Sequence, residues 1–397
     1  MANNLTAFNP EYWSNRMQVI RFNEPVFRAL ASYEERAMLK NGDTVHRPYR
    51  SRMTVQSYTK NTAVTVQDIS STDEFLSVDT TKVVPFYVDD LDELQNKWPT
   101  VNKFADDAGK ELYDFIDSDF LSEVINATSS LDDADVGGTA GTSIDLTTSN
   151  IAKMFAAAGK KLDRQNVDRK SRYAVISPTV HQLLLEKMDG KDTALGDEIG
   201  MNGKIGKYMG FELYLSNNLY WTGRWTPANQ PSDNDTVTIA GVVITFETGT
   251  IDVAGEVKSE TDLATTLTNL VNFLNAPGTS ISAKHQALTN ADDLNTLSGI
   301  SASSSGTYIT VTWKGGSEAV VSASEANDPW SLETVYLQFG QKGAIDLVIQ
   351  QAPKVAFKEV QDKLGKNVLP WTMYGKKTFV EGARALVNVK VNSATLA

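Results

Sequence analysis

The amino-acid sequence predicts an α+β protein in which a host fold is interrupted by a small inserted unit. Apolar residues at steps of three and four mark one long helix between about residues 100 and 126. Strand-like and helical segments alternate before residue 226 and strand patterns resume after residue 331. Between these parts the segment PANQPSDND has the composition of a linker. A chain of 397 residues is long enough for two or three domains.

Composition narrows the class of protein. Hydrophobic residues make up 41% and charged residues 22%, which is typical of folded globular proteins. The chain has no cysteine, which excludes disulfides, a thiolate nucleophile and cysteine-ligated zinc. A formal charge of -12 argues against general binding to nucleic acid or anionic membranes. The sequence shows no signal-peptide pattern and no apolar run of ~18 residues, so we expect a soluble protein kept in a cytoplasm.

The first eighty residues read as an arm followed by an extended ribbon. Residues 1–40 are polar at first and then show the spacing of a short helix around Phe27 and Leu30. A turn signal at Asn41-Gly42 opens a strand, which breaks at residues 59–62 and returns as AVTVQDIS. A two-stranded ribbon is marginal alone in water. It therefore needs a partner surface.

A spine helix and an alternating segment follow. The strand KVVPFY leads through the acidic VDDLDELQNKW to a helix from about Thr100 to Asn126, which at ~1.5 Å per residue would be ~40 Å long. After a polar loop we expect a helix over Ile151–Leu162, the strand YAVISP, a helix over Thr179–Met188, a Gly-rich loop and the strand FELYLS. The inserted unit, residues 227–330, combines paired strands with one helix and carries twelve acidic residues against three lysines.

Motifs for chemistry are weak throughout the chain. The sequence has no GxSxG, HExxH or GxxxxGK[ST] pattern, and we predict no catalytic, cofactor-binding or metal-binding residue. The Gly-rich run from Gly200 to Lys207 has the wrong spacing for a phosphate loop. A possible calcium loop starting at Asp133 lacks a third carboxylate and the bidentate glutamate. The acidic cluster at residues 89–93 could bind a cation, but we favour a charged helix start.

The distribution of charge along the sequence is more informative than these motifs. Between residues 40 and 60 five basic residues face only Asp43, whereas residues 89–126 hold eleven acidic residues and three lysines. These opposite charges predict docking of the ribbon on a neighbouring subunit, with two independently solvated faces as the alternative. The subunit-interface candidates are Arg47, Arg50, Arg52, Lys60, Asp89, Asp90, Asp92 and Glu93.

The order of these elements resembles a known family. A polar arm, a basic ribbon, VDDLDELQNKW before a long helix, YAVISP, a Gly-rich loop and the segments GQKGAIDLVIQQAPKV and FVEGARALVNVKV follow one another as in the major capsid proteins of tailed bacteriophages, the Hong Kong 97 fold. Residues 20–222 and 333–392 carry the likeness. The insert at 227–330 departs from the minimal pattern of this family.

The resemblance implies a division of the chain. Residues 1–40 would be the N-terminal arm, 41–80 the extended loop lying over a neighbour, and 81–130 the peripheral domain with its spine helix. Residues 131–226 would be the axial domain, 227–330 the inserted α+β domain, and 331–397 the return strands. We expect the insert to fold autonomously, because the segments PANQPSDND and EANDP that flank it have the composition of linkers. Because a strongly acidic unit is repelled by packed DNA, we expect it to lie on the outer surface of the shell.

The resemblance also implies a structural, non-enzymatic function. The protein would assemble in the host cytoplasm, through hexamers and pentamers, into the icosahedral capsid of a virion that encloses double-stranded DNA without sequence-specific binding. Separate scaffolding and portal proteins, and a decoration protein, are the expected partners, and no cofactor is expected. An encapsulin-like compartment of the same fold remains the alternative, and a non-capsid enzyme is a weaker one.

Overall fold

The computed structural model describes residues 20–35, 39, 42–50, 52–69, 71–95, 100–188, 206–315, 321–324, 330–361 and 364–393. Most of the polar arm and most of the Gly-rich loop therefore lie outside the described residues. Within the arm, the one-turn helix α1 (Phe27–Leu30) is shorter than the segment expected from the spacing of apolar residues. Its two end residues, Phe27 and Leu30, are buried in the main core.

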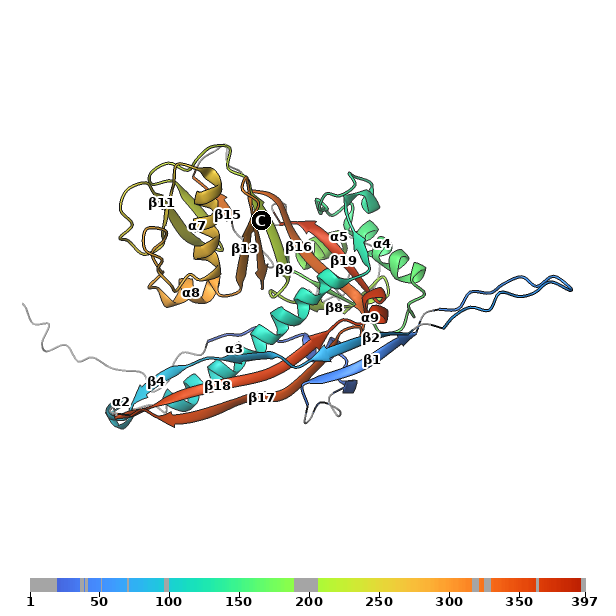
Figure 1. Cartoon of the computed structure of the whole chain (residues 1–397), viewed down its shortest axis with the longest axis horizontal. Helices are drawn as coiled ribbons and strands as arrows, with labels where there is room; N and C mark the ends of the chain where they lie inside the picture. The colour runs from blue at the N-terminus through green and yellow to red at the C-terminus, as the bar shows by residue number, and fades with distance from the viewer. Residues whose placement is uncertain are drawn as a thin grey trace, which may run out of the picture.

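The ribbon begins as two antiparallel strands and continues beyond them. β1 (Thr44–Arg50) pairs with β2 (Ser71–Ser77), in register from Thr44 opposite Ser77 to Arg50 opposite Ser71. The expected turn lies at Thr59–Thr62, where the amide of Thr62 donates to the carbonyl of Thr59. The sequence had suggested a return strand ending near residue 70, but the paired strand starts there. The segment between β1 and β2 reaches far from the rest of the subunit (Figure 1).

A spine helix lies beside a long β-hairpin. α3 (Thr100–Ser122) continues as the 3-10 turn η3 (Glu123–Asn126), which confirms the expected helix. β17 (Asp346–Glu359) and β18 (Gly365–Lys377) form the hairpin, and the strand expected at KVVPFY divides into β3 (Thr80–Val83) and β4 (Phe86–Asp89), both paired with β18. The short helix α2 (Asp90–Gln95) lies at the distal end of this hairpin (Figure 1).

A nine-stranded sheet forms the centre of the remaining part. Its main strand order is β13-β14-β9-β16-β6-β8-β7, with β19 paired to both β16 and β5. The strands of the host part are β5 (Ser129–Leu131), β6 (Arg172–Ile176), β7 (Lys207–Tyr208), β8 (Phe211–Leu215), β9 (Tyr220–Trp225), β16 (Trp330–Gln341) and β19 (Leu386–Asn392). The helical elements here are η4 (Asp133–Val136), α4 (Ile151–Arg164), α5 (Pro178–Met188) and α9 (Val380–Arg384).

Aromatic packing fixes α4 to this sheet. Phe155 is fully buried, and its ring centroid lies 5.0 Å from that of Tyr208, 6.2 Å from that of Phe211 and 5.1 Å from that of Phe339. The rings meet edge to face, the geometry that aromatic pairs prefer. α4 therefore packs on the sheet beside β19 and β5, and its Phe155 reaches side chains of β7, β8 and β16.

The insert adds strands to the central sheet beyond β9. β10 (Thr236–Ile239), β11 (Val242–Glu247), β12 (Glu256–Lys258) and β15 (Val321–Ala323) form a separate four-stranded sheet, with α7 (Leu263–Asn275) and α8 (Ala291–Leu297) beside it. The turn between β10 and β11 has positive φ at Ala240 and Gly241, as a tight two-residue hairpin requires. However, β13 (Ile300–Ser304) and β14 (Ile309–Lys314) join the central sheet, because β14 pairs with β9. Residues 227–330 are thus hydrogen-bonded into the host, and their autonomous folding stays a prediction.

Candidate assembly surfaces

The base of the ribbon is fastened to its own subunit by Arg47. Its guanidinium donates to Glu35 and, over 3.1 Å, to Asp346 Oδ2, and it lies 4.3 Å from the ring centroid of Phe379. Both carboxylates are nearly buried. Burial raises the pKa of Asp346 in spite of the nearby guanidinium. Arg47, selected from the sequence as an interface residue, therefore performs a structural task within the subunit.

Beyond this base, the tip of the ribbon, residues 52–69, exposes apolar side chains. Its two legs are held together by Gln67, whose side-chain amide accepts the N–H of Thr54 at 3.1 Å and donates to the carbonyl of the same residue. Val55 and Val66 are 102% and 87% exposed. The other exposed large apolar residues of the tip are Met53, Tyr58, Val64 and Ile69. So many exposed apolar side chains on a narrow ribbon mark an interaction surface.

The other basic candidates of the ribbon are also exposed. Arg50 ends β1, and Arg52 and Lys60 belong to the tip. Figure 1 places the ribbon tip and α2 at opposite extremes of the subunit. The basic ribbon and the acidic segment at α2 are therefore too far apart to meet within one copy.

The acidic candidates surround the start of α2. The carboxylate of Asp89 accepts the N–H of Leu91 at 2.9 Å, as expected of a residue that caps a helix start. Glu93 forms an ion pair with Lys366 of β18 at 2.6 Å. Asp90 begins the helix, and the side chain of Asp92 lies outside the described residues. This part of the cluster holds α2 to the hairpin, and its role between subunits stays a prediction.

Several carboxylates of the spine point into the subunit. Asp117 is fully buried, and its Oδ1 accepts the N–H of Phe27 at 2.9 Å. Asn218 donates to Asp117 over 3.3 Å and to Asp114 over 2.7 Å. Burial raises the pKa of Asp117 to about 6. These contacts attach the segment containing α1 to the spine helix. Some of the carboxylates that were expected to face a neighbouring subunit are therefore bonded inside their own subunit.

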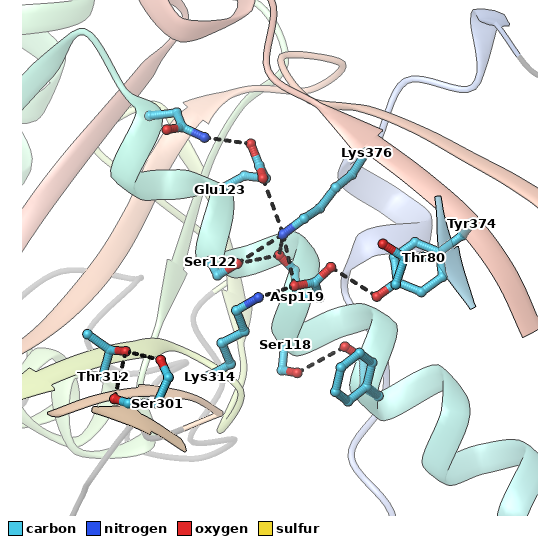
Figure 2. A network of polar contacts seen from close by, with 12 residues as sticks. Thr80, Ser118, Asp119, Ser122, Glu123, Ser301, Thr312, Lys314, Tyr374 and Lys376 are labelled. Atoms are coloured by element: carbon cyan, nitrogen blue, oxygen red, sulfur yellow. Dashed lines mark hydrogen bonds and ion pairs between the residues drawn. The ribbon is translucent and has the colours of Figure 1, made fainter. Parts of the chain in front are cut away.

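Asp119 links three structural units (Figure 2). Its Oδ1 accepts from Lys314 of β14 at 2.5 Å and pairs with Lys376 of β18 at 3.0 Å, while its Oδ2 accepts from the Tyr374 hydroxyl at 2.9 Å. Lys376 also pairs with Glu123 at 3.2 Å. Burial raises the pKa of Asp119, but the two ammonium groups outweigh this and leave it below its usual value. The network ties the spine to the long hairpin and to the inserted segment.

Neither charged network can be recognised in the sequence. The residues paired with Arg47 and Asp119 lie up to 299 and 257 positions away, so no local pattern connects them. The sequence near Asp119 gives only a partial signal, because Ile116, Phe120, Leu121 and Val124 form an apolar stripe on one side of the helix. A carboxylate beside such a stripe can become buried, and a buried charge requires partners.

Among the described residues, no helix is long and apolar enough to span a membrane, and no three His, Asp or Glu residues form a metal-binding group. Asp135 of the suspected calcium loop is occupied by an ion pair with Lys161.

A subunit with a spine helix, a long hairpin and a ribbon extended into solvent belongs to the class of capsid shell proteins. A profile of the family described as "Phage capsid protein" matches residues 50–272, more than half of the chain. The protein therefore belongs to this family. No curated protein sequence matches the chain significantly.

Solved structures show the same fold at low sequence identity. A structure described as Mycobacterium phage Che8 has a TM-score of 0.59 and 15% identity, and the match covers 98% of both chains. A structure titled as the capsid of Cyanophage P-SCSP1u has a TM-score of 0.57 and 12% identity, covering 98% of this chain and 94% of the other. The mature capsid of bacteriophage PhiM1 has a TM-score of 0.50 and 13% identity, covering 97% and 92%.

These findings confirm the phage-capsid resemblance and the α+β capsid fold stated from the sequence. The protein is a major capsid protein with a structural role in the shell of a phage, and an encapsulin-like compartment is not favoured. The domain boundaries and the interface residues stay predictions.

Proposed function

We propose that copies of this chain form hexamers and pentamers that close into an icosahedral virion shell around double-stranded DNA. The exposed apolar tip of the ribbon carries this proposal. A surface of this kind is rarely left in water by a folded protein, and fully burying one valine contributes about 1.5–3 kcal/mol. Assembly in the host cytoplasm, together with scaffolding, portal and decoration proteins, belongs to the same proposal.

The ribbon combines a fixed base with a protruding tip. Arg47 and its carboxylate partners set the direction in which the ribbon leaves the subunit. Gln67 then keeps its two legs side by side. A neighbour that covers the tip would bury its valines, complete the apolar packing that a two-stranded ribbon lacks, and so link two copies of the chain.

The experiment compares assembly of three forms of the full chain. Val55→Ser with Val66→Ser removes apolar contact from the tip, and Thr65→Ser alters another exposed tip residue with little loss of apolar surface. We expect the unmodified chain and the threonine control to form closed shells, seen by negative-stain electron microscopy. We expect the valine variant to remain as folded subunits with an unchanged circular dichroism spectrum.

The outcomes distinguish an error about the ribbon-tip contact from an error about shell assembly itself. Normal shells from the valine variant would refute the contact made by the ribbon tip. If the unmodified chain forms no shells, even when produced with the other structural proteins of its virus, the proposed assembly itself is wrong. Shells purified from infected cells without double-stranded DNA would refute the proposed content.

A further inference from the structure

Opposite charges gather on two sides of the central sheet. On one side, residues 153–172, which form most of α4, the segment that follows it and the start of β6, contain seven basic residues against two carboxylates. The exposed cations of this basic face are Lys153, Lys160, Arg164, Arg169 and Lys170. At the β13 end lies the insert, with twelve acidic residues against three lysines. This separation of charge runs along the subunit rather than between its inner and outer faces.

The basic face contains a hollow of about 720 Å³ between α4 and the turn that joins β7 to β8. Lys160 and Arg164 line it, together with Phe155 and with Met209, which is 52% exposed. Arg169 and Arg172 also line it but are both paired with Asp163, at 2.9 and 2.6 Å. The hollow thus offers cations beside apolar surface, which suits a loop that carries a carboxylate next to an aliphatic side chain.

The insert presents such a loop at its far edge. The strand order of its sheet is β12-β11-β10-β15, and β15 is the strand that packs next to β16 of the host. The loop between β11 and β12 therefore lies away from the host. It exposes Asp252 and, immediately after it, Val253, which is 58% exposed. Figure 1 shows β11 on the side of the molecule opposite α4.

We propose that the acidic edge of the insert, with Asp252 and Val253, docks into the basic hollow of α4 on the adjacent copy of the chain. Two different patches at opposite ends of one subunit make a head-to-tail contact, which closes into a ring when the rotation between copies permits it. The inference rests on the proposed shell assembly and assigns its in-ring contact. It also gives the insert a role as a brace between subunits.

Packaged DNA is the rival occupant of the basic face. A DNA-binding surface contacts a rigid, evenly charged backbone through exposed cations. Here Arg169 and Arg172 share the single charge of Asp163, which offsets one of their two positive charges, and the remaining cations border an apolar hollow. The chain also offers the hollow a complementary protein surface, since its insert is strongly acidic. These features favour a second copy over DNA.

Zero-length carbodiimide cross-linking of assembled shells tests the contact. Shells are built from a mixture of light and ¹⁵N-labelled chains, so that mass spectrometry distinguishes links between copies from links within one copy. We expect links from Lys153, Lys160 or Lys170 to carboxylates of the insert, and none from the exposed Lys358 of β17. Shells in which those lysines never link to an insert would overturn the proposal, as would formaldehyde links from them to DNA in filled particles.

A charge-swap series gives a second readout. Lys160→Glu with Arg164→Glu should reduce the yield of shells about tenfold, because like charges would then meet across the contact. Adding Asp252→Lys in the same chain restores complementarity in every contact of the ring, so the yield should recover. Equal yields with and without the aspartate change would refute the pairing. Because unmodified shells are scored in parallel, a failure here is distinct from a failure to assemble at all.

Discussion

Replacing Asp119 by asparagine tests how far one buried charge organises the subunit. The substitution keeps the size of the side chain but removes the charge shared by Lys314 and Lys376, and it weakens the acceptor of the Tyr374 hydroxyl. Tyr374 is fully buried and cannot turn to water. Its hydroxyl would keep at best a neutral partner, which is about half as strong as a charged one.

The loss of stability depends on the partners and the hydration that Lys314 and Lys376 keep after the substitution. Removing one partner of a buried ion pair costs about 3–5 kcal/mol when the remaining charge is isolated. Lys314 is 42% exposed and can be hydrated, and Lys376 keeps Glu123 at 3.2 Å. We therefore expect Asp119→Asn to lower the free energy of unfolding by about 2–3 kcal/mol. The matched control is Asp107→Asn on the same helix, which breaks a solvent-accessible pair with Lys110 and should cost below about 1 kcal/mol.

Denaturation of unassembled subunits by urea, followed by circular dichroism, measures both values. The pH dependence provides an independent check because the pKa of Asp119 is lowered in the folded state. Its stabilising contribution is present above the ordinary aspartate pKa of about 3.9 and is lost as pH falls through the lowered value. The asparagine variant should lose this part of the acid sensitivity. The reasoning would be refuted if Asp119→Asn and Asp107→Asn had equal urea midpoints, or if Asp119→Asn lost stability on acidification as steeply as the unmodified protein.

Three further expectations concern the ribbon, the hairpin and the attachment of α1. Arg47→Ala should lower the free energy of unfolding by about 3 kcal/mol, because it leaves two nearly buried carboxylates without their cation. Arg50→Ala should leave the free energy of unfolding unchanged, and the urea midpoints of the two variants test the difference. A Cβ on Gly375 would lie 2.1 Å from the last carbonyl oxygen of β2, so Gly375→Ala should lower the thermal midpoint. Gly109 has open space around it, so Gly109→Ala should instead raise the free energy of unfolding by about 0.5–1 kcal/mol. The raised pKa of Asp117 means that its contribution is present at low pH and lost as pH rises through about 6. Between about pH 4 and 6.5 this group should therefore lower the thermal midpoint of the unmodified protein as pH rises, and a slope unchanged in Asp117→Asn would contradict this.

Local patterns explain which parts of the fold could be predicted. The spine helix was found because its apolar stripe depends on residues three and four positions apart. The turn at residues 59–62 was found from its composition. The pairing of β1 with β2 was missed because STDEFLS alternates poorly and contains polar residues typical of turns. The joining of β14 to β9 was missed because the composition of the insert says nothing about which strands it shares with the host.

The candidate site was predicted less well, for a physical reason. Charge clustering along the sequence identified the ribbon and the acidic region. It could not tell which of these charges have partners within the same subunit. Arg47, Glu93 and Asp117 all have partners in their own subunit, at separations of 12 to 299 residues. Such pairing depends on the three-dimensional arrangement, so a charge can be assigned to an interface only after these internal partners are known.

The internal networks also decide which contacts remain for assembly. The chain has 37 basic residues against 49 acidic ones, and internal ion pairs remove charges of both signs, so an excess of negative charge remains. Copies with this net charge repel one another at long range. A face that keeps several exposed cations, as α4 does, is then the place where an acidic neighbour can approach, and an apolar ribbon tip can bind without opposing charge. In the proposed assembly, attraction between the copies is thereby confined to the basic face of α4 and the ribbon tip, and this confinement favours one orientation of neighbours over nonspecific aggregation.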